Sequence, residues 1–308
     1  MLVVFHHLAS YYQWHYFLWV PLQSFRMPLY YILSGLFFKE YNGMYDFILR
    51  KTNRLLIPFL FFYLLTSVPL TIIVQHRTFW DALIAFSITW DFENGCIWFL
   101  LSLFQVNALF YIIFKLFGRQ NAWWLVVISL SFGCLGLMLS SYAIRYRCFF
   151  DTSLTVLPFF YFGYFLNHNT EYLQKKWNKV YVLCFIVIMS CFVFLFAAEQ
   201  DFGLNRFSNY YVIYPCGIIG TIIVFEVAKC LKRVPLISYL GRYSIIVLCT
   251  HMLVMKPVRH LMSPFGFNEE ISMWVNFIVT ILSMLLVIPF CRSFVPSFTA
   301  QKDLIPLK

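Results

Sequence analysis

Long apolar stretches alternate with short polar ones along the whole chain. A bilayer core about 30 Å thick needs roughly 20 helical residues to cross it, and windows of that length identify ten candidate spans. The polar stretches between them carry charged and turn residues, and no internal repeat is evident. The pattern therefore predicts an all-α polytopic membrane protein, with residues 1–308 forming a single domain. The candidate spans are residues 1–20, 21–38, 55–75, 97–117, 121–140, 153–167, 180–198, 209–229, 236–258 and 271–291.

The composition supports lipid as the main solvent of this protein. Of its 308 residues, 61% are hydrophobic, only 12% are charged and 21% are aromatic, and the mean hydropathy is +0.75. A soluble domain of this size is nearer half apolar and a quarter charged, because its surface must stay polar. The composition excludes a soluble nucleotide-fold enzyme, a disordered chain and a disulfide scaffold.

Basic residues are unevenly distributed between the polar stretches. The 23 Lys and Arg outnumber 13 Asp and Glu, which gives a net charge of +10. In a membrane protein such an excess is typical of cytoplasmic loops, and we expect no nucleic-acid partner. With a cytoplasmic amino terminus, fifteen basic residues fall in inner segments and seven in outer ones, which predicts that both termini are cytoplasmic. The outer residues are Arg26, Arg77, Arg145, Arg147, Arg206, Lys256 and Arg259.

The first candidate span begins abruptly, because Met1 leads straight into apolar sequence without a basic anchor. No secretory signal is evident, and we expect the first helix to extend upstream of Met1. Six of the nine cysteines lie inside apolar runs and are interpreted as small apolar fillers. Cys96 and Cys148 are expected near the outer side, and their spacing does not argue for a disulfide.

Three histidines within or beside apolar runs are functional candidates, because ionisable groups are costly in lipid. His6 and His7 follow Val3-Val4-Phe5, and His251 shares one helix face with Ser244. A neutral imidazole accepts a proton from a hydroxyl near physiological pH, which suits a general base. The alternatives are an interfacial histidine pair and a buried, hydrogen-bonded His251.

Two further segments have both a functional and a structural interpretation. Arg50, Lys51 and Arg54 are either a phosphate site, since guanidinium groups match phosphate oxygens, or a cytoplasmic anchor of the third span. Ser34-Gly35, with Pro28 in the same span, marks either irregular backbone beside a cavity or close helix packing. The sequence shows no pattern of metal ligands, and we predict no metal site.

Taken together and in this order, these segments resemble the integral-membrane acyltransferase family 3, which acylates sugars and related hydroxyl compounds. The resemblance runs from residue 2 to about residue 251, and each segment is weak evidence alone. The matching segments are Leu2-Val3-Val4-Phe5-His6-His7, Met27 to Gly35, Arg50 to Arg54 with Pro58, Trp98-Phe99-Leu100, Phe162-Gly163-Tyr164-Phe165, and Leu240-Gly241-Arg242-Tyr243-Ser244 continuing to His251.

The resemblance implies roles for particular residues. It makes His7 the catalytic histidine and assigns acyl-coenzyme A, in particular acetyl-coenzyme A, to Arg50, Lys51 and Arg54, with no permanently bound cofactor. The other candidates are His6, Ser34, Trp98, Arg242, Ser244 and His251. Family members usually carry an arginine about ten residues before the histidine, and this chain begins too late to contain it.

The implied function is O-acylation, and specifically O-acetylation, of a cell-surface sugar or polysaccharide, within polysaccharide biosynthesis. The implied place is the bilayer of a bacterial cytoplasmic membrane. One alternative is a polytopic transporter or flippase for a polysaccharide precursor, for which ten helices and buried histidines are also suitable. A third is a non-catalytic scaffold or sensor. The sequence leaves the acceptor and the oligomeric state open.

Overall fold

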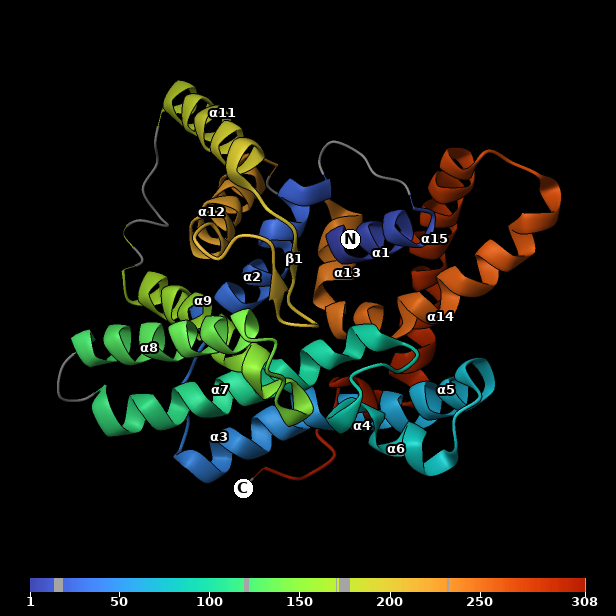
Figure 1. Ribbon diagram of the computed structural model, residues 1–308, viewed down its shortest axis with the longest axis horizontal. Helices are drawn as coiled ribbons and strands as arrows, with labels where there is room; N and C mark the ends of the chain where they lie inside the picture. The colour runs from blue at the N-terminus through green and yellow to red at the C-terminus, as the bar shows by residue number, and fades with distance from the viewer. Residues whose placement is uncertain (14–18, 119–121, 170, 172–177, 232, 308) are drawn as a thin grey trace. The chain divides into compact units, whose positions relative to one another are not determined.

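The computed structural model describes residues 1–13, 19–118, 122–169, 171, 178–231 and 233–307 (Figure 1). These residues are almost entirely helical, with one antiparallel pair of two-residue strands, β1 (Gln200–Asp201) and β2 (Arg206–Phe207). The prediction of an all-α chain is therefore confirmed. Part of the first predicted span lies outside the described residues. So do five basic residues assigned to the inner side, namely Arg119, Lys175, Lys176, Lys232 and Lys308.

Seven helical stretches among the described residues are long and apolar enough to cross a membrane. The protein is thus a polytopic membrane protein. The three remaining predicted spans correspond to α1 (Leu2–Tyr11), α2 (Trp19–Leu36) and α11 (Lys179–Phe196). The seven stretches are Met44–Gln75, Gly95–Phe117, Trp123–Ser141, Arg147–His168, Ile213–Leu231, Ser244–Phe265 and Glu269–Phe294.

The chain divides into two compact units that interleave in the sequence. The first unit consists of Met1–Phe17, Leu49–Leu101 and Arg233–Lys308, and the second of Leu18–Ile48 and Ser102–Lys232. The single domain expected over residues 1–308 stays a prediction.

In the first unit, α1 packs against α14 (Ser244–Met262) and α15 (Glu269–Phe294) (Figure 1). The Phe5 ring lies 5.5 Å from the Trp274 ring. The Asn276 amide nitrogen on α15 donates to the Tyr12 hydroxyl and to the Met255 carbonyl. These contacts fix α1 beside α14. This unit also contains α6 (Phe79–Ile88), α13 (Pro235–Arg242) and the 3₁₀ turns Gly95–Ile97, Ser263–Phe265 and Pro296–Thr299.

Residues 44–75 form one helical run that contains two π-helical turns. The run consists of α3 (Met44–Lys51), a π turn (Thr52–Leu56), α4 (Ile57–Phe62), a second π turn (Tyr63–Ser67) and α5 (Val68–Gln75). Pro58 and Pro69 each stand just after one π turn. A proline lacks the amide hydrogen and its ring crowds the carbonyl four residues earlier, so the helix widens locally before each proline.

In the second unit, α2 and α9 (Phe150–His168) approach at a pair of glycines. A Cβ atom on Gly35 would lie 1.9 Å from the Phe160 carbonyl oxygen, and one on Gly163 would lie 1.9 Å from the Ile32 carbonyl oxygen. Only glycine permits this approach, so the structure favours the close-packing interpretation of Gly35. The unit also contains α7 (Trp98–Phe117) from Ser102 onward, α8 (Ala122–Ser141), the 3₁₀ turn Arg147–Phe149 and α12 (Ile213–Leu231).

Candidate functional site

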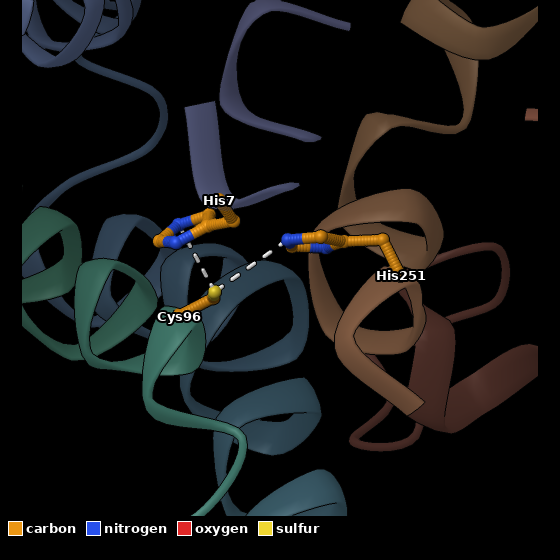
Figure 2. Close-up of side chains that lie close together, drawn as sticks. All are labelled: His7, Cys96 and His251. Atoms are coloured by element: carbon orange, nitrogen blue, oxygen red, sulfur yellow. Dashed lines mark hydrogen bonds between the residues drawn. The ribbon is translucent and has the colours of Figure 1, made fainter. Parts of the chain in front are cut away.

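A cysteine and two histidines meet in the first unit, although they lie far apart in the sequence. The sulfur of Cys96 is 3.2 Å from Nε2 of His7 and 3.5 Å from Nε2 of His251. The two imidazole centroids are 5.5 Å apart. Figure 2 shows the sulfur between the two rings, each of which comes from a different element. We call these three residues the Cys–His cluster.

The orientation of the His251 ring follows from a backbone hydrogen bond. His251 is fully buried, and its Nδ1 lies 2.9 Å from the Val247 carbonyl oxygen, one helical turn earlier. A carbonyl oxygen only accepts, so Nδ1 carries the hydrogen and, in the neutral ring, Nε2 presents a lone pair toward Cys96. The predicted alternative of a buried, hydrogen-bonded His251 is thus confirmed, and its second nitrogen is available for chemistry.

His7 is less buried than His251, and α1 holds it in place. The guanidinium of Arg259 on α14 donates to the Tyr11 carbonyl at 2.6 Å and lies 4.3 Å from the Tyr11 ring centroid. This contact secures the carboxyl end of α1. His6 is buried, and its ring is 5.8 Å from that of His7 in an edge-to-face arrangement. Of the two histidines, His7 is the one that joins the Cys–His cluster.

Hydrogen bonds and an ion pair hold the loop that places Cys96 beside the histidines. Asn94 is 2% exposed and adopts a left-handed backbone conformation with φ of 56°. Its amide nitrogen donates to the Thr66 hydroxyl and to the Cys249 carbonyl, each at 3.0 Å. The Glu93 carboxylate pairs with Lys256 on α14. The loop is thereby fixed to the second π turn and to α14, immediately before the 3₁₀ turn that contains Cys96.

The basic segment Arg50 to Arg54 is helical, whereas we expected a polar stretch between spans. Arg50 and Lys51 end α3, and Arg54 lies in the first π turn. The Arg54 side chain is 63% exposed, and its Nε is 3.9 Å from Asp303. Between these residues, buried Asn53 accepts from the backbone amides of Leu304 and Ile305 and donates to the Ile305 carbonyl. The basic segment therefore also holds the carboxyl-terminal tail.

The other candidates take more peripheral positions. In the second unit, the Ser34 hydroxyl accepts from the Asn107 amide at 3.1 Å. In the first unit, Trp98 begins α7 two residues after Cys96, while Arg242 ends α13 and Ser244 begins α14, both exposed. Ser244 and His251 share a helix as predicted, but Ser244 is exposed where His251 is buried.

Sequence reasoning missed Cys96. It is 6% exposed and none of the nine cysteines forms a disulfide. Its separation of 89 residues from His7 and 155 from His251 gives no local motif. The one available signal was its position just before Trp98-Phe99-Leu100.

The Cys–His cluster also has the donor set of a metal site, since its three donor atoms lie within 4.8 Å of one another. Thiolate and imidazole are ligands that zinc accepts.

The fold and the cluster together show a polytopic membrane protein in which one thiol and two imidazoles lie close together. The model of a family described as "Acyltransferase domain" matches residues 1–292. Because the match covers nearly the whole chain, the protein belongs to this family, acyltransferase family 3, and is a membrane acyltransferase. The resemblance found in the sequence is thereby confirmed. The chain matches no curated protein and no solved structure.

Proposed function

We propose that this acyltransferase moves an acyl group, in particular acetyl, from acyl-coenzyme A to a hydroxyl of a cell-surface sugar or polysaccharide. The observation that carries the proposal is the position of His7 within the Cys–His cluster, 3.2 Å from the sulfur of Cys96. A partly exposed imidazole beside buried reactive groups is suited to receive a proton from an incoming hydroxyl. Family membership favours this function over a transporter, a flippase or a non-catalytic scaffold.

In the proposed reaction His7 acts as the general base. Its Nε2 takes the proton of the acceptor hydroxyl while the oxygen attacks the acyl carbonyl, and general bases of this kind contribute about 10²- to 10⁴-fold to the rate. Arg50, Lys51 and Arg54 bind the phosphates of the donor, since basic side chains pair with phosphate oxygens. The donor is a substrate, so the protein needs no permanently bound cofactor for this chemistry.

The proposed setting is a bacterial cytoplasmic membrane, with ten spans and both termini in the cytoplasm. The donor then approaches from the cytoplasm, and the acceptor belongs to polysaccharide biosynthesis at the outer face. Two features support this setting, namely the bias of basic residues toward the predicted inner segments and the apolar helices of the chain.

Transfer of radiolabelled acetyl from acetyl-coenzyme A into membrane glycans tests the proposal. We expect the wild-type protein to label a glycan fraction, and His7→Ala to lower the rate at least 100-fold because the hydroxyl loses its base. His260→Ala is the matched control, since His260 is exposed near the end of α14 and should leave the rate unchanged. Full activity of His7→Ala would refute the assignment of the base.

A further inference from the structure

We propose that Cys96 is the acyl carrier of this enzyme and that the acyl group passes through a thioester on its sulfur. The inference rests on the proposed function and adds a catalytic residue and a covalent step to it. A thiol is a strong nucleophile once a neighbouring base removes its proton. The sulfur of Cys96 has two candidate bases beside it, His7 Nε2 at 3.2 Å and His251 Nε2 at 3.5 Å. Dashed lines in Figure 2 mark both contacts.

The two histidines differ in burial and hydrogen bonding, and this difference suggests a separate role for each. His251 is fully buried, and its Nδ1 hydrogen is committed to the Val247 carbonyl. Its Nε2 lone pair is therefore directed at the thiol, and we assign this base to Cys96. His7 is half-buried rather than fully buried, and we assign the acceptor hydroxyl to it. One base is thus suited to the thiol and the other to the acceptor.

In the first half-reaction, Nε2 of His251 takes the thiol proton of Cys96, and the sulfur attacks the carbonyl carbon of the acyl donor. A carbon–sulfur bond to Cys96 forms as the carbon–sulfur bond to coenzyme A breaks. The leaving thiolate takes the proton from His251 and departs as the free thiol. One thioester replaces another, so the step needs no further reactant.

In the second half-reaction, Nε2 of His7 takes the proton of the acceptor hydroxyl, and the oxygen attacks the thioester carbonyl. The carbon–oxygen bond of the ester forms as the carbon–sulfur bond to Cys96 breaks. The sulfur then recovers its proton from His7, which lies within direct reach. Both histidines and the thiol return to their starting state.

The local backbone conformation at Cys96 differs from that at the other buried cysteines. Cys216, Cys249 and Cys291 all lie inside long helices, where a cysteine is a small apolar filler. Cys96 instead lies in a 3₁₀ turn, and Asn94 and Glu93, just before this turn, anchor it to the second π turn and to α14. A nucleophile needs such fixed placement, because acyl transfer requires alignment of the attacking atom.

The test uses the purified full-length protein with radiolabelled acetyl-coenzyme A and no acceptor. We expect release of one coenzyme A per active chain and label on the protein that neutral hydroxylamine removes, as it does for thioesters. Mass spectrometry should place the acetyl group on the peptide that contains Cys96. With acceptor present, initial rates should follow ping-pong kinetics.

Variants sharpen the result. Cys96→Ala should lose the label and slow acetyl transfer at least 100-fold. Cys216→Ser should keep the label and the wild-type rate, since it alters another buried cysteine that lies outside the first unit. His251→Gln should slow labelling of the protein, while His7→Gln should allow labelling but block its transfer to acceptor. This split would not arise from a merely structural role.

The outcomes separate this inference from the proposed function. Wild-type transfer with sequential kinetics, no labelled Cys96 and full activity of Cys96→Ala would overturn the inference and leave the proposed function intact. Label on His7 would also overturn it. One zinc per chain, lost in Cys96→Ala and required for activity, would overturn it in favour of a metal centre. No transfer from acyl-coenzyme A at all would overturn the proposed function itself.

Discussion

Asn94 shows how a single residue holds the loop that carries Cys96. Its left-handed backbone, with φ of 56°, is tolerated by asparagine better than by most residues. Its amide nitrogen also joins two segments, because one hydrogen bond reaches Thr66 and the other reaches Cys249. Conformation and hydrogen bonding therefore both depend on this side chain.

Replacing Asn94 tests this role. Asn94→Ala should destabilise the first unit by about 3–4 kcal/mol, from two lost hydrogen bonds of about 1 kcal/mol each and a left-handed cost of about 1–2 kcal/mol. Asn94→Gly removes the same hydrogen bonds, but glycine adopts the left-handed backbone conformation without strain. This variant should therefore lose less stability than Asn94→Ala. Thermal unfolding of the detergent-solubilised protein measures both, and equal melting of Asn94→Ala and wild type would contradict the prediction.

The three members of the Cys–His cluster differ in how far the sequence identifies them. His7 and His251 were identifiable because an imidazole in an apolar run is costly and so marks a candidate site. A cysteine carries no such cost, since it is common in buried positions. Cys96 therefore looked like an ordinary residue near the start of a span, and only the fold brings it to the histidines.

At the scale of the element, the basic segment combines two features that its sequence pattern did not predict. Its residues are helical because the run from Met44 continues through a π turn before Pro58. The same turn binds the carboxyl-terminal tail through Asn53. A count of charged residues gives the sidedness of such a segment, whereas the π turn and the docked tail depend on the proline and on distant residues.

Charge reversal tests whether this segment binds the donor. The double variant Arg50→Glu and Arg54→Glu should raise the apparent KM for acyl-coenzyme A about tenfold or more, because the donor phosphates would face carboxylates. The acceptor KM should stay the same. Initial rates at varied donor concentration measure the effect, and an unchanged donor KM would leave the segment as a membrane anchor.

Two controls make that result specific. Arg233→Glu reverses an exposed cation that the sequence also places on the inner side, and it should not change the donor KM. Asp303→Asn removes the tail carboxylate near Arg54 without altering the basic segment. If Asp303→Asn reproduced the double variant, Arg54 would act through the tail rather than on phosphate.

At the scale of the whole molecule, hydropathy identified the class of protein and most of the long helices. The spans predicted at 97–117 and 271–291 coincide closely with Gly95–Phe117 and Glu269–Phe294. The predicted span 236–258 instead divides at Tyr243 into α13 and α14. Apolar content gives the approximate position of a helix, but turns inside an apolar run depend on packing and backbone contacts that composition does not contain.

The number of spans determines which sides of the membrane the termini occupy. Seven spans would place the two termini on opposite sides, whereas the ten predicted spans place both in the cytoplasm. The difference lies in α1, α2 and α11, and the 10 residues of α1 cover only about 15 Å.

We expect epitope tags at each terminus to resist protease added to intact spheroplasts and to be cleaved after permeabilisation. A tag in the predicted outer segment near Asn209 should be cleaved in intact spheroplasts. Cleavage of one terminal tag but not the other in intact spheroplasts would refute the ten-span arrangement and favour an odd number of crossings.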